Sequence, residues 1–121
     1  MLRRCLLIGA VGLMAAAARA APPPHELSRI ERLIRYVESQ KDMKFVRNGS
    51  EYSSADAGRF LRGKMEAMGA EVTTAREFIE RIATKSSMSG RPYHVKFADG
   101  HQMPAAEFLG AELKRMESQP A

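Results

Sequence analysis

The sequence predicts an α+β fold, a small single domain of about four helices with two short β-hairpins. Four segments carry apolar residues at intervals of three and four, the spacing of a helix that is buried on one face. Two dipeptides, Asn48-Gly49 and Asp99-Gly100, are typical of tight hairpin turns because these residue types tolerate positive φ. Each is flanked by short alternating runs, so the hairpins are expected between the helices.

Residues 1–20 have the features of a secretory signal peptide. Arg3 and Arg4 form a basic start, residues 5–18 are apolar, and Ala18-Arg19-Ala20 presents the small residues that signal peptidases recognise. The apolar run is shorter than the roughly 20 residues that a membrane span needs. We therefore expect cleavage near Ala20 and no transmembrane segment in the mature chain; a retained anchor is the alternative.

Cleavage would leave a periplasmic or secreted domain that is only weakly basic. The net charge of +5 includes three arginines of the signal peptide, and the only cysteine, Cys5, lies there too. The mature chain would then have no disulfide and no cysteine nucleophile. Its modest charge and its export both argue against a nucleic-acid partner.

The first helix is expected over residues 25–40, after a proline-rich lead-in at 21–26. The three consecutive prolines Pro22-Pro23-Pro24 favour an extended conformation there. The apolar stripe of the helix consists of Leu27, Ile30, Leu33, Ile34 and Val37. The globular domain is expected to span residues 27–116, with a flexible tail at 117–121.

The first hairpin is centred on Asn48-Gly49. A two-residue turn there would place Arg47 opposite Ser50 and Phe45 opposite Tyr52, where the two aromatic rings stabilise the ribbon. Because the flanking strands are short, a structured loop is the alternative.

The second helix is expected to begin after Ser53, which can cap it with Asp56 three residues on, and to end at Gly69. Its apolar stripe is Ala57, Phe60, Leu61, Met65 and Met68. Residues 58–65 nearly match a phosphate-binding loop, but Met65 replaces the hydroxyl that would hold magnesium and no strand precedes the glycine. Nucleotide binding is therefore not predicted.

A third helix is expected to start at Thr74, with Glu77 completing a second capping box, and to fade at Thr84-Lys85. Alternation over residues 93–97 then predicts a half-buried strand, which Asp99-Gly100 turns back into a short strand at 101–103. Pro104 ends that strand and suits the first turn of a final helix. The apolar residues of this helix are Ala105, Phe108, Leu109, Leu113 and Met116.

The loop at residues 85–92, Lys-Ser-Ser-Met-Ser-Gly-Arg-Pro, is the candidate recognition site because it is polar, small and conformationally loose. The candidate binding residues are Arg47, Asn48, Lys85, Ser86, Ser87, Ser89, Arg91 and His94. Arg47, Lys85 and Arg91 could converge with loop amides on an anionic group. The alternative is a turn whose hydroxyls bond their own backbone.

Catalytic and metal sites have weaker support. A loop serine could pair with His94, but neither a GxSxG nor an SxxK motif is present. With a two-residue turn at Asp99-Gly100, His94 and His101 would share one face yet lie roughly 13 Å apart at the rise of a strand. No metal and no cofactor is therefore predicted. Met88 and Met103, if exposed, could form an apolar contact patch beside the loop.

Two motifs, FVRNG at residues 45–49 and TKSSMSGRPY at 84–93, resemble a bacterial family of small exported proteins classed as a domain of unknown function. The helix that carries Ala57, Leu61 and Lys64, and residues 74–79, add to the resemblance, which covers about residues 27–113. It implies an exported single domain and no particular activity.

We therefore predict a non-catalytic periplasmic binding or interaction module that uses loop 85–92 and the Arg47–Gly49 turn. Its partner would be a periplasmic protein or an anionic envelope ligand. One alternative is a small hydrolase or amidase with a loop serine. Another is an envelope-associated structural protein whose basic helix 25–40 contacts anionic lipid or peptidoglycan.

Overall fold

The computed structural model describes residues 22–119, so the predicted signal peptide lies outside the described residues. Four helices are present in this range: α2 (Pro24–Glu38), α3 (Ser54–Met68), α4 (Ala75–Arg81) and α5 (Ala105–Glu117). Four short strands accompany them: β1 (Lys44–Arg47), β2 (Ser50–Ser53), β3 (His94–Lys96) and β4 (Gln102–Pro104). This confirms the predicted α+β class.

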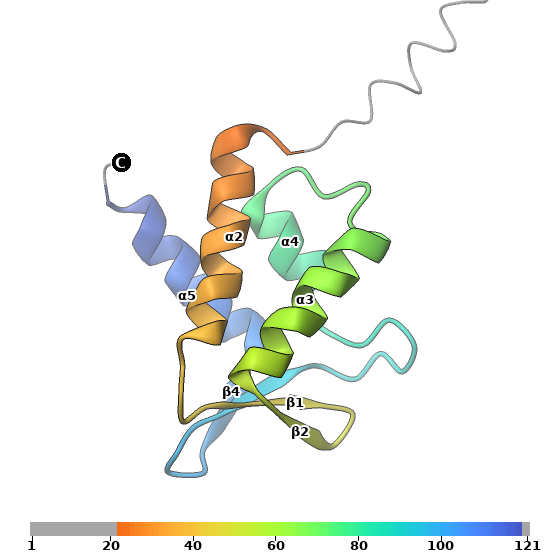
Figure 1. The fold of residues 1–121 in the computed structure, drawn as a ribbon, viewed down its shortest axis with the longest axis vertical. Coiled ribbons are helices and arrows are strands. Elements are labelled where there is room, and N and C mark those ends of the chain that lie inside the picture. The colour runs from red at the N-terminus through yellow and green to blue at the C-terminus, as the bar shows by residue number, and fades with distance from the viewer. Residues whose placement is uncertain (1–21, 120–121) are drawn as a thin grey trace, which may run out of the picture.

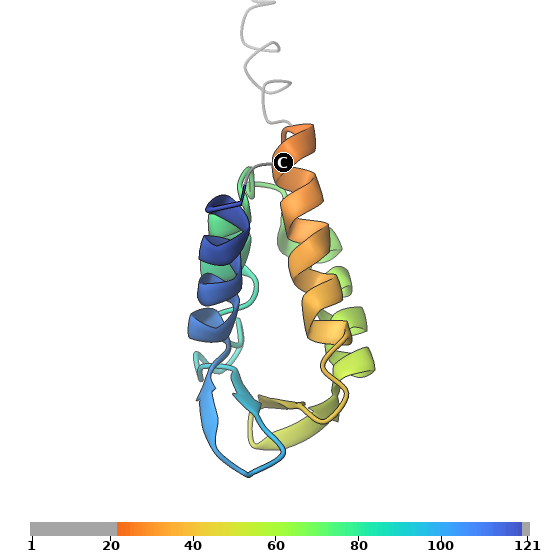
Figure 2. The ribbon, with the colours of Figure 1, turned by 90° about the vertical axis from the view of Figure 1, so that its left-hand side faces the viewer.

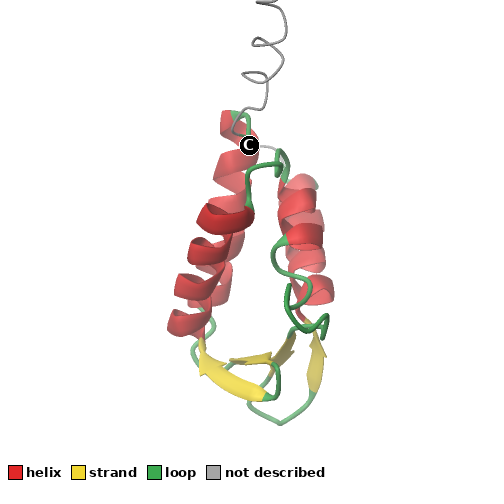
Figure 3. Cartoon of the chain, turned by 90° about the vertical axis from the view of Figure 1, so that its right-hand side faces the viewer, coloured by secondary structure: helices red, strands yellow, loops and turns green. Residues whose placement is uncertain are grey.

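The two hairpins join into one antiparallel sheet with strand order β2-β1-β3-β4. Its centre is the pairing of β1 with β3, which sets Phe45 opposite Val95. The sheet lies across one end of the molecule, and the helices extend from it (Figure 1). Seen from the side, α2 and α3 form one layer and α4 and α5 the other (Figure 2), with the strands below both (Figure 3).

The core lies between the helix layers and the inner face of the sheet. Its largest fully buried side chains are Tyr93, Phe45, Phe78, Leu33, Leu61, Ile82, Leu109, Leu113, Val37, Val72 and Val95. Because side chains alternate along a strand, Val46 and His94 lie on the opposite, outer face of the sheet. No helix in the described part of the chain is long and apolar enough to cross a membrane.

Local sequence signals account for two helix starts and one hairpin turn. Ser53 caps α3 by accepting a hydrogen bond from the Asp56 N–H (3.1 Å), and Thr74 caps α4 through the Glu77 N–H (3.0 Å). Asn48 and Gly49 both adopt positive φ, and they place Arg47 opposite Ser50 as predicted.

The first helix differs from its prediction at both ends. It begins at Pro24, inside the lead-in that was expected to be extended, and it ends at Glu38 instead of residue 40. Proline suits a first helical turn because its fixed φ is helical and the missing N–H would have no partner there. This first turn extends beyond the neighbouring helices (Figure 2), and Leu27 remains half exposed despite its place on the apolar stripe.

The second hairpin has a longer turn than predicted. Lys96 lies opposite Gln102, and the Phe97 N–H donates to the His101 carbonyl (2.9 Å), so residues 98–100 form a three-residue loop. Asp99 favours it by accepting a hydrogen bond from the His101 N–H (3.0 Å). The His101 ring therefore stacks on Phe97 on the inner face, with centroids 4.5 Å apart. The expectation that it shares a face with His94 was wrong.

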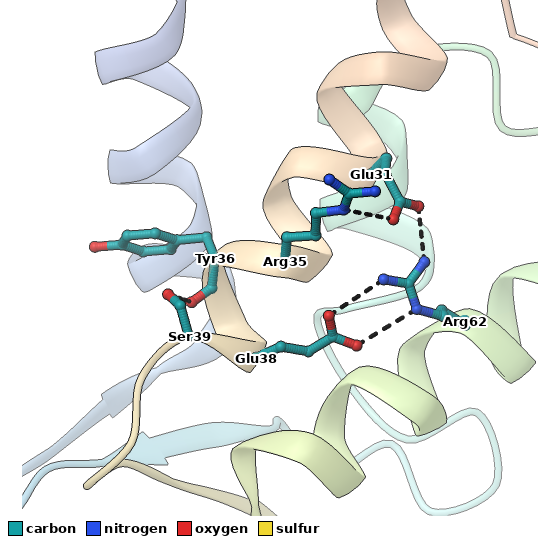
Figure 4. A network of polar contacts seen from close by, with 6 residues as sticks. All are labelled: Glu31, Arg35, Tyr36, Glu38, Ser39 and Arg62. Atoms are coloured by element: carbon teal, nitrogen blue, oxygen red, sulfur yellow. Dashed lines mark hydrogen bonds and ion pairs between the residues drawn. The ribbon is translucent and has the colours of Figure 1, made fainter.

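Polar contacts join α2 to α3 across a close helix crossing (Figure 4). Arg62 donates to Glu31 (2.7 Å) and to Glu38 (3.2 Å), and Arg35 holds the other oxygen of Glu31 (3.1 Å). A Cβ at Gly58 would lie 2.2 Å from the Glu38 carboxylate, so only glycine fits this crossing without moving Glu38. The crossing positions α3, which carries one wall of the candidate site.

Candidate anion-binding pocket

A pocket of about 400 Å³ lies between α3, the β1–β2 turn and loop 85–92. Its lining comes from these three places and from the buried Tyr93: Arg47, Asn48, Arg59, Phe60, Gly63, Lys64, Met68, Ser86, Ser87, Met88 and Tyr93. The volume is within the range of small-molecule sites. The predicted neighbours, loop 85–92 and the turn after β1, thus border the same hollow.

Helix α3 supplies one wall through residues on a single face. Gly63 and Lys64 follow Phe60 by three and four residues, and Met68 follows Lys64 by four, which places these residues on one face. Gly63 leaves this face open, because no atom lies within 4 Å of the position that a Cβ would occupy there.

Lys64 is one of two basic lining residues that sequence reasoning missed; the other is Arg59. Lys64 is only 8% exposed. Its ammonium donates to the Lys85 carbonyl (2.8 Å) and to the Tyr93 hydroxyl (2.9 Å). An ammonium has three donors, so these contacts leave one N–H to spare. The available signal was its position: Lys64 follows Phe60 by four residues and Leu61 by three, on the apolar side of the helix.

The surroundings of Lys64 disfavour its charge. Burial lowers its pKa below the ordinary value, and the nearby positive charge of Arg47 lowers it further. Burial also raises the pKa of the Tyr93 hydroxyl, although Arg47 opposes that rise. Among the described residues, no carboxylate forms an ion pair with Lys64. An added anion would therefore relieve an unfavourable local charge.

Arg47 and Arg59 bring two more cations to the pocket. The Arg47 guanidinium lies over the Phe60 ring, 4.7 Å from its centroid, and donates to the Tyr52 hydroxyl (3.3 Å). Arg59 pairs with Asp56 on the preceding helical turn. None of the lining residues is acidic. The pocket is therefore electropositive, and its field favours an anion.

Loop 85–92 is a closed turn that uses most of its own hydrogen-bonding groups. The Ser86 N–H donates to the Arg91 carbonyl (3.0 Å), and the Gly90 N–H donates to the Ser86 carbonyl (2.9 Å). The buried Ser86 hydroxyl accepts from the N–H groups of Met88 (3.3 Å) and Ser89 (3.2 Å). Ser86 therefore shapes the loop, as the alternative interpretation of its hydroxyl expected.

The other two loop serines link the loop to the pocket walls. The Ser89 hydroxyl donates to the Asn48 side-chain oxygen (2.6 Å), which ties the loop to the β1–β2 turn. The Ser87 hydroxyl approaches the Met68 sulfur (3.5 Å). Between them Met88 extends into solvent and is 97% exposed. The contact from Ser89 to Asn48 spans 41 residues of sequence, so the fold alone brings these residues together.

Four candidate residues lie apart from the pocket lining: Lys85, Ser89, Arg91 and His94. The Lys85 side chain borders a different hollow, together with Glu71 and Glu80, although its carbonyl accepts from Lys64. Arg91 lies beside Gly49 outside the pocket, and His94 belongs to the outer sheet face. The cations that converge are thus Arg47, Arg59 and Lys64, in place of the expected Arg47, Lys85 and Arg91.

The loop serines contact groups other than histidine in the described part of the chain. The hydroxyls of Ser86, Ser87 and Ser89 contact loop amides, a methionine sulfur and an asparagine, and none of these contacts involves a histidine. Within residues 22–119, no three His, Cys, Asp or Glu side chains gather closely enough to hold a metal.

Comparison with known proteins places the chain in a family. Residues 24–117 match DUF5329, a family of unknown function. The chain belongs to the DUF5329 family. It is 35% identical over 81 residues to the uncharacterized protein YfeK of Salmonella typhimurium strain LT2, an alignment that covers 67% of this chain and 68% of YfeK. No solved structure matched the chain. The DUF5329 match covers every helix and strand described above, and with them the whole pocket lining.

Proposed function

We propose that this DUF5329 protein is a non-catalytic binding module of the periplasm or cell exterior, and that its pocket binds the anionic group of a small ligand. Export rests on the signal-peptide pattern at residues 1–20, with cleavage near Ala20. The observation that carries the binding role is an acid-free lining with three cations, one of which is the buried Lys64. Buried charges in proteins are normally paired, so this one favours an external anion.

The proposal can be tested with 8-anilinonaphthalene-1-sulfonate, a fluorescent anion of suitable size for the pocket. The purified protein should increase its fluorescence in a saturable manner. Lys64→Met and Arg47→Met should each weaken binding about tenfold, because a hydrogen bond to a charged group contributes roughly 1.5–3 kcal/mol. The matched control is Arg32→Met on α2, which removes an exposed positive charge outside the pocket lining and should leave the affinity unchanged.

Thermal unfolding of each variant would establish that it is folded at the titration temperature. Lys64→Met also removes two internal hydrogen bonds, whereas the half-buried Arg47 can be replaced with less effect on the core. If Arg47→Met is folded and binds the dye as tightly as the unmodified protein, the pocket is not the anion site and the proposal is wrong.

A further inference from the structure

Exposed apolar side chains gather at the pocket. Three large apolar side chains are substantially exposed among the described residues, Leu27, Met68 and Met88. Two of them, Met68 and Met88, line this pocket. Exposed apolar side chains that gather at one hollow indicate a contact surface. Methionine suits such a surface because its flexible thioether adapts to ligands of different shape.

Two of the three cations, Lys64 and Arg47, are less exposed than the methionines, whereas the side chain of Arg59 is 73% exposed. Lys64 is 8% exposed and bonds to Tyr93, which is 1% exposed, whereas Met68 is 51% and Met88 97% exposed. The Phe60 ring also lines the pocket and carries the Arg47 guanidinium on its face. A ligand that satisfies this order has a charged end that enters first and an apolar part that remains near the surface.

Compact polyanions such as phosphate are bound in many proteins by a nest of free backbone N–H groups. Loop 85–92 has few N–H groups to offer a ligand, because those of Ser86, Met88, Ser89, Gly90 and Arg91 already donate within the loop. Recognition of the charge thus depends on a few cationic side chains. A single anionic group with an apolar body fits this lining better than an inorganic polyanion.

We infer that the ligand is a single-chain amphiphilic carboxylate, with its carboxylate beside Lys64 and Arg47 and its alkyl chain against Phe60, Met68 and Met88. This inference rests on the proposed binding function and specifies the ligand of that same pocket. An alkyl carboxylate leaves the Lys64–Tyr93 and Lys64–Lys85 contacts in place, because it needs only the remaining N–H of the ammonium. Burial of the chain adds roughly 0.8 kcal/mol for each CH₂ group.

Displacement of the bound fluorescent sulfonate distinguishes the ligand classes. Decanoate should displace the dye at concentrations at least tenfold lower than decylamine, which has the same chain and the opposite charge. Decanoate should also displace the dye at concentrations at least tenfold lower than acetate or inorganic phosphate, which carry the charge without the chain. All competitors are used below their micelle-forming concentrations.

A methionine variant tests the position of the chain. Met68→Gln with Met88→Gln keeps the side-chain length and removes the apolar sulfur, and because both residues are exposed the fold should be retained. The double variant should weaken decanoate about fivefold or more and leave acetate unchanged. Leu27→Gln, at an exposed apolar residue outside the pocket lining, is the matched control and should have no effect.

The outcomes separate this inference from the proposed function. Suppose that dye binding depends on Arg47 and Lys64 but phosphate or decylamine competes as well as decanoate. The proposed anion-binding function then stands, and the inference of an amphiphilic carboxylate ligand is wrong. Equal binding of decanoate by the methionine variant would also overturn the inference. If substitution of Arg47 and Lys64 does not change the affinity for the dye, the proposed function itself is wrong.

Discussion

Lys64 has contacts that suit a structural and a binding role at once. Its ammonium connects the middle of α3 to the Lys85 carbonyl and to the Tyr93 hydroxyl, so it holds loop 85–92 against the helix. Neither acceptor is a carboxylate, and a buried ammonium without a carboxylate partner is destabilised relative to one in water. The residue that anchors the loop is therefore also the one that gains most from an incoming anion.

Anion binding should consequently weaken as the pH becomes alkaline. Burial and the neighbouring Arg47 lower the pKa of Lys64 below the ordinary lysine value of 10.5, and the ammonium is charged only below its pKa. Affinity for the fluorescent sulfonate should therefore be full near neutral pH and fall as the pH rises, before 10.5 is reached. Titrations at a series of pH values at constant ionic strength would measure the midpoint.

Arg47→Met tests whether the pKa of Lys64 sets the pH dependence of anion binding. It removes the cation that helps to lower the pKa of Lys64, so the midpoint should move to higher pH although binding is weaker overall. Lys64→Met should remove this dependence. A wild-type affinity that stays constant up to the ordinary lysine value would show that Lys64 does not contact the anion.

Sequence reasoning identified only some of the residues that line the pocket, and the reason differs from residue to residue. Arg47, Asn48, Ser86 and Ser87 were found because turn and loop chemistry can be seen locally. Lys64 and Arg59 were missed because a charged residue on an amphipathic helix normally faces solvent. Only the position of loop 85–92 against α3 makes Lys64 a pocket residue, and that contact joins positions 21 residues apart.

Helix α3 connects the structural and the candidate functional parts of the molecule. Gly58 and Arg62 face α2 at the close crossing, while Phe60, Lys64 and Met68 face the pocket. A displacement of α3 from α2 would therefore move one pocket wall. The ion pairs of Figure 4 stabilise the position of that wall.

Arg62→Met should weaken this crossing by up to about 1 kcal/mol near neutral pH, the usual range for partly exposed ion pairs. The hydrogen bond from Arg62 is the main reason that the pKa of Glu31 lies below its ordinary value of 4.5, against the opposing effect of burial. A lowered carboxyl pKa stabilises the fold above the unfolded value, and this contribution disappears as the pH falls through the folded value. Urea unfolding of both proteins at several pH values would measure the difference.

The difference between Arg62→Met and the unmodified protein should therefore become small well below pH 4.5. Arg81→Met, which removes an exposed pair with Glu71 away from the crossing, should change stability less at every pH. If Arg62→Met is equally destabilising in acid, the Arg62 side chain acts through the packing of its methylene groups and not through its charge.

At the scale of elements, local chemistry was the reliable guide. Both N-caps and the Asn48-Gly49 turn could be predicted because each depends on residues that are adjacent in sequence. The second hairpin was shifted by one residue because Asp99-Gly100 suits a two-residue turn as well as the longer loop that the Asp99 side chain stabilises. Pairing of β1 with β3 could not be inferred, since it joins strands about fifty residues apart.

For the whole molecule, we predict that the protein is exported from the cytoplasm. The chain expressed from its own start should be recovered in the periplasmic or secreted fraction, and its N-terminus should be Ala21, because Ala18-Arg19-Ala20 is the expected cleavage sequence. Cell fractionation with N-terminal sequencing or intact-mass measurement would establish both points. Replacement of Ala18 and Ala20 by bulky residues should retain the longer form, and recovery of the full-length chain in the cytoplasm would contradict export.

The order of the elements also divides the chain into two equivalent halves. Helix, two strands and helix occur as α2-β1-β2-α3 and again as α4-β3-β4-α5, and the two inner strands pair antiparallel as a local two-fold axis would relate them. The equivalent connections differ in length: residues 39–43 lead from α2 to β1, whereas residues 82–93 lead from α4 to β3. The longer connection contains loop 85–92. Helix α4 has 7 residues where α2 has 15, so the helix and its connection together have nearly the same length in both halves, residues 24–43 and 75–93. The candidate ligand site is thus built where the pseudo-symmetry is broken, by a loop that takes the place of the second part of a helix.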